Sequence, residues 1–106
     1  MSDTIYYNKL VRDRIPEIIR SQGKLCVTET LSDSDYLKML DAKLDEELAE
    51  YHKDRNAEEL ADLLEVIYAA AAARGCSASE LDRIRAEKAR KRGAFGKKIL
   101  LVEAER

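Results

Sequence analysis

The apolar residues of this chain recur mostly at helical spacing. Between positions 32 and 54 they follow one another at steps of three and four, which places them on one face of a helix. The members of this stripe are Leu37, Leu40, Leu44, Leu48 and Tyr51. Ser32, with Asp35 three residues later, resembles a helix start. We therefore predict an amphipathic helix that runs to about Asp54.

A second, more apolar helix is predicted directly afterwards, over about 57–74. From position 60 to position 73 only Asp62 and Glu65 carry a charge. A helix that is apolar nearly all round is usually buried, so we expect this one to be central. Asn56 suits its N-cap. The short polar stretch before it makes the two helices antiparallel neighbours.

Two shorter helices complete the pattern. The first is expected over 14–22, with Asp13 as its cap and Pro16 in its first turn, where a missing N–H costs little. The last is expected over 78–92, opened by Ser77 in a capping box. Its inner face is expected to consist of the following residues: Leu81, Ile84, Lys88 and Arg92.

The remaining segments lack helical periodicity. Residues 4–12 are expected to be an extended or irregular lead-in. Residues 25–30 are rich in β-branched types and are expected to form a short strand, which an apolar strand over 97–105 could pair with. The predicted fold is therefore all-α: one domain over residues 1–106, a four-helix bundle with short extended segments at both ends.

One short acidic motif occurs twice in the central pair of helices. EELAE at 46–50 returns as EELAD at 58–62, twelve positions later. Each copy carries two carboxylates three residues apart, a spacing that puts both on one face of a helix. These four candidates are Glu47, Glu50, Glu59 and Asp62.

A hairpin with its turn between positions 54 and 55 would bring Glu50 near Glu59, and Glu47 near Asp62. Four acids in one place repel one another unless a cation lies among them. Carboxylate oxygens favour magnesium, manganese or calcium. The four acids are therefore a candidate metal site, and the alternative is a hairpin of ordinary solvated acids. Helical periodicity places Glu46 opposite the apolar stripe, where we expect it to be solvated.

Charge is distributed unevenly along the chain, although the formal net charge is only −2. Residues 29–65 hold 13 acids and 4 bases, whereas residues 83–98 hold 8 bases and 1 acid. Such a division suits a site that holds a metal and an anionic ligand together, and it equally suits a salt-bridged pair of surface helices. The candidate residues for contact with such an anionic ligand are Lys9, Arg12, Lys88 and Arg92.

Composition excludes several classes of protein. No stretch of eighteen apolar residues occurs and no secretory signal is visible, so we expect neither a membrane span nor export. Two cysteines fifty positions apart make no disulfide framework, and a reducing cytoplasm is the expected location. The negative net charge and the lack of a recognisable motif argue against a nucleic-acid partner. With no Trp and one Phe the core is modest, which predicts a dimer or tetramer.

The two acidic segments together resemble the EExxE…ExxD signature of the MazG-like superfamily of all-α nucleoside triphosphate pyrophosphohydrolases. The resemblance extends to NKLVRDRIPEII, YLKMLDAKLDEELAEY, EELADLLEVIYA and EKARKRGAFGKKILL. Together these segments resemble a small branch described as phosphoribosyl-ATP pyrophosphohydrolase-like. One departure is that only eight residues separate Glu50 from Glu59, fewer than is usual between the two halves of the signature.

The resemblance implies magnesium-dependent hydrolysis of a nucleoside triphosphate, including non-standard ones, to a monophosphate and pyrophosphate, with manganese as a substitute ion. It implies that the metal ligands are Glu47, Glu50, Glu59 and Asp62, and that Glu46 has a less direct role. It also implies that the phosphates of the nucleotide are contacted by Lys9, Arg12, Lys88 and Arg92. Glu65 is a secondary candidate for the catalytic base. The alternative is a helical nucleotide-binding or oligomerisation module that keeps the fold without turnover.

Overall fold

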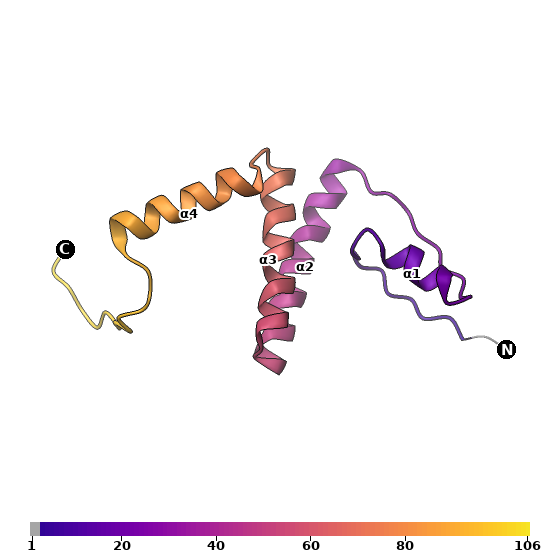
Figure 1. Ribbon diagram of the computed structural model, residues 1–106, viewed down its shortest axis with the longest axis horizontal. Coiled ribbons are helices and arrows are strands. Elements are labelled where there is room, and N and C mark those ends of the chain that lie inside the picture. Colours follow the sequence, from indigo (N-terminus) through magenta and orange to yellow (C-terminus); the bar gives the residue numbers. More distant parts are fainter. Residues whose placement is uncertain (1–2) are drawn as a thin grey trace.

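A computed structural model describes residues 3–106 of the chain as four helices joined by irregular segments (Figure 1). In chain order they are α1 (Ile15–Ser21), α2 (Asp33–Asp54), α3 (Ala57–Ala73) and α4 (Ala78–Arg92). No strand occurs in this range. The predicted all-α class is therefore confirmed, and each helix begins and ends close to its predicted bounds.

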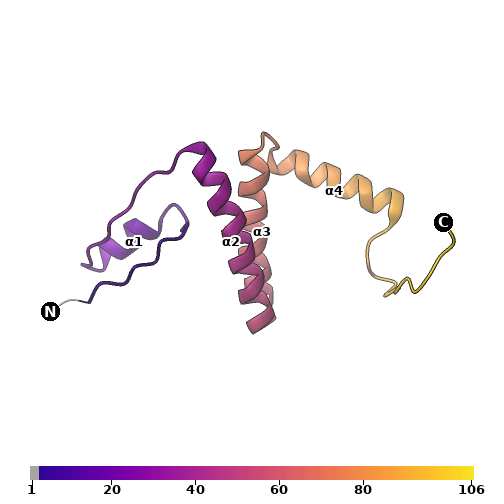
Figure 2. The ribbon, with the colours of Figure 1, turned by 180° about the vertical axis from the view of Figure 1, so that it is seen from behind.

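The helices α2 and α3 form an antiparallel hairpin and pack against each other along their length (Figures 1 and 2). The turn is short because Arg55 takes a left-handed conformation, with φ of 51°, and its N–H donates to the Tyr51 carbonyl at 2.7 Å. The Asn56 side chain then accepts a hydrogen bond from the Glu59 N–H at 2.9 Å. The predicted hairpin and its cap at Asn56 are both confirmed.

The other two helices extend away from opposite sides of this hairpin (Figures 1 and 2). The helix α1 lies on the α2 side and contacts no other helix, whereas α4 contacts only α3. The Cα radius of gyration is 18.4 Å, while a compact chain of this length has about 13 Å. The four helices therefore do not form a bundle within one chain.

Few side chains are buried, because the helices are arranged so openly. Among the described residues only Leu40 on α2 is buried, with 4% of its surface exposed. The expected burial of α3 is wrong, because α2 alone covers it along its length. Leu60 and Leu64 of α3 keep 46% and 45% of their surface exposed.

Three local predictions are wrong. The segments 25–30 and 97–105 are irregular rather than paired strands, and they lie on opposite sides of the hairpin (Figure 1). A strand needs a neighbour to satisfy its backbone N–H and C=O groups, and the hairpin separates these two segments. Asp13 does not cap α1: its N-cap is Arg14, which makes no capping hydrogen bond through its side chain.

Other helix ends agree with the sequence. The Ser32 hydroxyl accepts from the Asp35 N–H, and the Ser77 hydroxyl accepts from the Glu80 N–H, each at 3.2 Å. Pro16 lies in the first turn of α1 as expected. No helix in the described part of the chain is long and apolar enough to cross a membrane.

Candidate functional site

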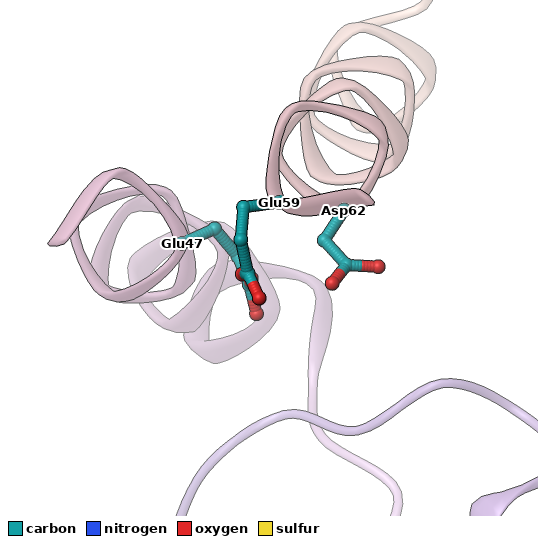
Figure 3. A group of neighbouring side chains, drawn as sticks. All are labelled: Glu47, Glu59 and Asp62. Atoms are coloured by element: carbon teal, nitrogen blue, oxygen red, sulfur yellow. The ribbon is translucent and has the colours of Figure 1, made fainter. Parts of the chain in front are cut away.

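Three carboxylates meet near the closed end of the α2–α3 hairpin (Figure 3). Glu47 comes from α2, and Glu59 and Asp62 come from the first two turns of α3. One oxygen from each lies within 4.8 Å of the others, and all three residues are half-buried. A second group on the same hairpin consists of Glu50, Asp54 and Glu59, whose carboxylate oxygens also lie within 4.8 Å of one another.

Each of the four predicted ligands thus belongs to one of two groups, and the two groups share Glu59. The expected proximity of Glu47 to Asp62, and of Glu50 to Glu59, is confirmed as geometry. Their role as metal ligands stays a prediction. Sequence reasoning missed Asp54, which lies four residues after Glu50 and therefore on the same face of α2.

The crowding of these carboxylates has an electrostatic consequence. The pKa of the Glu59 carboxyl is raised above its ordinary value, first by partial removal from water and then by the neighbouring negative charges. Those charges belong to Asp54, Asp62, Glu50 and Glu47. A cation placed among these groups would relieve this repulsion.

The donor set also suits a hard divalent cation. It consists only of carboxylate oxygens, the ligands that magnesium and manganese prefer. The three oxygens lie within 4.8 Å of one another, whereas adjacent ligands around a six-coordinate magnesium are about 3 Å apart, so the side chains would rotate toward a shared ion on binding it.

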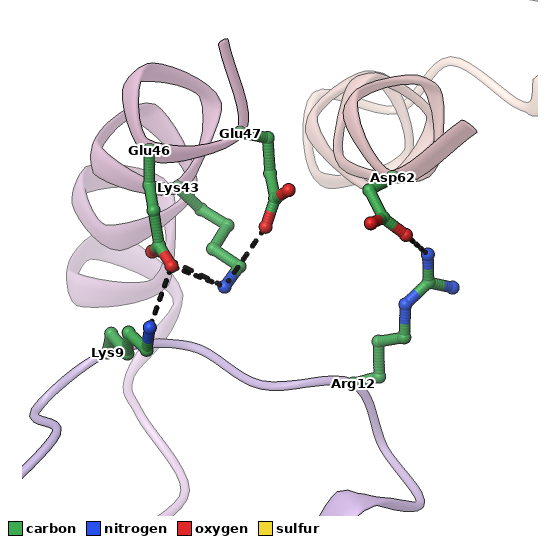
Figure 4. A network of polar contacts seen from close by, with 6 residues as sticks. All are labelled: Lys9, Arg12, Lys43, Glu46, Glu47 and Asp62. Carbon is green, nitrogen blue, oxygen red and sulfur yellow. Dashed lines mark hydrogen bonds and ion pairs between the residues drawn. The ribbon is translucent and has the colours of Figure 1, made fainter. Parts of the chain in front are cut away.

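The segment before α1 crosses this acidic group and supplies two cations (Figure 4). The Lys9 ammonium donates to a Glu46 oxygen at 2.8 Å, and the Arg12 guanidinium donates to Asp62 Oδ1 at 2.7 Å. Two of the four predicted phosphate-binding residues thus lie beside the predicted metal ligands. The predicted solvation of Glu46 is wrong, since its side chain is 29% exposed and held by Lys9.

The ion pair between Lys9 and Glu46 shifts the pKa values of both residues. The pKa of Lys9 is raised, mainly by its hydrogen bond to Glu46. The pKa of Glu46 is lowered, first by that hydrogen bond and further by Lys43, although partial burial opposes the change. Both groups are therefore charged together over a wider pH range than either would be alone.

Lys43 is a further cation that sequence reasoning missed. Its ammonium lies 3.3 Å from Glu46 and 3.4 Å from Glu47, and its side chain is only 16% exposed (Figure 4). The signal was present in the sequence, because residues three and four positions apart on a helix are neighbours. Lys43 therefore balances part of the negative charge on the α2 side of the site.

The other two predicted phosphate-binding residues are not part of this arrangement. Lys88 and Arg92 are exposed on α4, which leaves α3 at the end opposite the acids (Figure 1). The expected inner face of α4 is also uncovered, with Ile84 49% exposed. Within one chain, the basic helix and the acidic hairpin end do not meet. Glu65, the secondary candidate, is exposed and belongs to neither carboxylate group.

Comparison with known proteins identifies no family. No protein-family model matches the chain, and no solved structure matches it. An uncharacterized protein of Mycolicibacterium smegmatis (strain ATCC 700084 / mc(2)155) is 64% identical over 42 residues. Those residues make up 40% of this chain and 43% of that protein, so the match spans less than half of either. Its name assigns no activity.

Proposed function

We propose that this protein is a metal-dependent nucleotide pyrophosphohydrolase, which cleaves a nucleoside triphosphate to a monophosphate and pyrophosphate. The observation that carries the proposal is the meeting of Glu47, Glu59 and Asp62 within 4.8 Å on two helices. The likeness of EELAE and EELAD to the MazG-like signature supports the same reaction. Magnesium is the proposed ion, with manganese as its substitute.

The residues of the site divide into two roles. The proposed ligands are the carboxylates Glu47, Glu50, Glu59 and Asp62, to which the geometry adds Asp54. When bound, a divalent cation supplies charge neutralisation for the triphosphate and lowers the pKa of a nearby water. Lys9 and Arg12, at the edge of the acids, would turn from their carboxylate partners to contact phosphate oxygens.

One carboxylate of the site must also accept a proton from the attacking water. Glu50 and Asp54 are exposed, and each lies within 4.8 Å of Glu59, so a water held there would face solvent and substrate together. Glu65 is a weaker choice, since it lies outside both groups. Because the helices of one chain do not form the four-helix bundle expected from the sequence, this proposal assigns the bundle to the oligomer that the sequence also predicts. The expected cytoplasmic location belongs to the proposal as well.

The direct test is pyrophosphate release from purified protein. We would incubate it with a panel of standard and non-standard nucleoside triphosphates, with magnesium, with manganese and with a chelator. The expected result is release from at least one nucleotide that requires the metal and disappears in Asp62→Asn. No release from any nucleotide with either metal would refute the proposal.

A second candidate is a helical nucleotide-binding or oligomerisation module without turnover. The observation that favours it is the large apolar surface left uncovered, including Phe95 at 97% and Leu64 at 45% exposure. Under this alternative the protein would self-associate or bind nucleotide in a calorimeter while releasing no pyrophosphate. The panel above therefore separates the two functions.

A further inference from the structure

Residues 3–31 form an N-terminal arm that is joined to the α2–α3 hairpin by two ion pairs. The helix of this arm, α1, contacts no other helix and so does not anchor it. In the part of the chain that the structure describes, no other hydrogen bond joins the arm to the hairpin. The position of the arm therefore depends on the charges that the two ion pairs bring together.

The two ion pairs differ in the acid that each of them holds. Lys9 donates to Glu46, which belongs to neither carboxylate group (Figure 4). Arg12 donates to Asp62 Oδ1 at 2.7 Å, and Asp62 is one of the three half-buried carboxylates of the candidate metal site. Arg12 is thus bound to a carboxylate that a divalent cation would also use.

Arg12 offsets part of the negative charge of this carboxylate group. The oxygens of Glu47, Glu59 and Asp62 lie within 4.8 Å of one another, so the three groups repel unless positive charge lies beside them. Lys43 on α2 supplies one such charge at 3.4 Å from Glu47, and Arg12 on the arm supplies another. The chain therefore provides some of the positive charge that a divalent cation would bring.

A divalent cation and Arg12 would share Asp62 unfavourably. Two cations on one carboxylate lie well within the Debye length of about 8 Å at physiological salt, so salt does not remove their repulsion. Arg12 reaches Asp62 from the side that faces away from Glu47, and it does not fill the space between the acids (Figure 4). The conflict is therefore one of charge and not of space.

The opposite effect of Arg12 on metal binding has to be weighed as well. A group that donates to a ligating carboxylate can fix its orientation and so strengthen metal binding. Such a partner must itself be held in place, whereas the Arg12 side chain is 57% exposed and its arm lacks a helix contact. Repulsion therefore outweighs orientation at this pair.

We propose that Arg12 competes with a divalent cation for Asp62, so that the N-terminal arm inhibits metal binding. Occupation of the carboxylate group releases Arg12 from Asp62, while the pair of Lys9 with Glu46 keeps the arm attached. By thermodynamic linkage, the Arg12–Asp62 pair weakens metal binding by the same factor by which the metal weakens the pair. The inference rests on the metal site of the proposed function and is independent of pyrophosphate release.

The first experiment measures the binding of Mn²⁺ alone, and of Mg²⁺ alone, by calorimetry. Arg12→Gln removes the competing charge and should tighten metal binding by at least about 5-fold, the lower end of common coupling between two sites. The matched control is Arg14→Gln, because Arg14 pairs with Glu17 of α1 at 3.3 Å and not with the hairpin. The control should change the affinity by less than about 2-fold, since charges farther apart are screened.

The two variants remove the same charge, and both arginine side chains are more than half exposed, so both variants should fold. Equal tightening in the two variants would show that net charge alone is responsible and would overturn the proposal. Unchanged binding in Arg12→Gln would also overturn it. Weaker binding would do the same and would identify Arg12 as a residue that orients Asp62.

The second experiment follows the Arg12 side chain itself. Phenylglyoxal modifies free guanidinium groups, and pairing with Asp62 protects Arg12 from this reagent. Saturating Mg²⁺ should raise the rate of Arg12 modification, read by peptide mass spectrometry against Arg14, by about the factor by which Arg12→Gln tightens binding. In Asp62→Asn the rate should be high without any metal. An Arg12 rate that does not respond to Mg²⁺ in the wild-type protein would overturn the proposal.

These measurements separate the inference from the proposed function. Tighter metal binding in Arg12→Gln, together with no pyrophosphate release from any nucleotide, would support the inference and refute the proposed function. Metal-dependent release without tighter binding in Arg12→Gln would do the reverse. Failure of the wild-type protein and of both variants to bind either metal would overturn both.

Discussion

The two charged regions of this protein are organised in different ways. The acidic end of the hairpin is held by a tight turn, a cap at Asn56 and ion pairs from Lys9 and Arg12. The basic helix α4 touches only the end of α3, and both Lys88 and Arg92 are exposed. One region is thus positioned by its own chain, whereas the other lacks such support within the part of the chain that the structure describes.

The largest expected effect is on chemistry at the acidic end. Asp62→Asn should lower pyrophosphate release by at least about 100-fold, because the amide brings no negative charge to a bound cation. The matched control is Asp82→Asn on α4, since Asp82 pairs with Arg85 at 3.0 Å much as Asp62 pairs with Arg12. The control should keep near-wild-type activity. Equal losses of pyrophosphate release in both variants would show that the loss comes from removing any one negative charge and not from changing the acidic site.

Shortening a leucine side chain should affect the free energy of unfolding differently in the hairpin and in the C-terminal segment. Leu40→Ala should lower the free energy of unfolding by about 2–4 kcal/mol, because Leu40 is buried on α2 and its loss leaves a cavity. Leu101→Ala, at a residue 76% exposed, should change it by less than about 0.5 kcal/mol. Urea unfolding at one fixed protein concentration measures both. A similar loss at Leu101 would show that the C-terminal segment is packed in solution.

Loss of a helix cap should also affect the hairpin and α4 differently, with smaller changes in stability. Asn56→Ala leaves the Glu59 N–H without its partner and should cost about 1 kcal/mol of global stability. Ser77→Ala removes the equivalent bond at α4, but a helix with little packing should fray locally instead. Amide hydrogen exchange can separate the two responses. Global destabilisation by Ser77→Ala would mean that α4 unfolds together with the hairpin.

The smallest effect is expected at the contact between the N-terminal segment and α2. Glu46→Gln should cost at most about 1 kcal/mol, because the Lys9 side chain remains 43% exposed and such pairs are screened by salt. The loss in stability should shrink as salt is raised from about 0.05 M to 0.5 M. Pyrophosphate release should fall only a few-fold, far less than in Asp62→Asn. A loss as large as that of Asp62→Asn would make Glu46 a ligand.

Local features of the fold were predictable from sequence to the extent that neighbouring residues decide them. The caps at Ser32, Asn56 and Ser77 depend on a side chain and a backbone N–H three residues later, and all three are present. The approach of Glu47 to Asp62 followed from helical spacing and a short turn. Such features need no knowledge of the rest of the chain.

Features that depend on distant segments were predicted poorly. Glu46 was expected to be solvated because helical periodicity describes only the faces of its own helix. The side chain that covers it, Lys9, is 37 residues away in sequence, and Arg12 is 50 residues from Asp62. Burial of α3 was expected from its composition, but among the described helices only α2 covers it along its length, and α4 contacts it near one end.

The sequence by itself determined the four helices, the hairpin and the set of acids that the hairpin gathers, because spacing and capping act over a few residues. The tertiary structure alone decided which cations reach those acids. It places Lys9 and Arg12 beside them, whereas the helix that carries Lys88 and Arg92, α4, leaves α3 at the opposite end (Figure 1). The physical reason is that helical periodicity places the acids of one helix on a common face. Contact between these acids and the cations of a distant segment depends instead on how the separate segments pack.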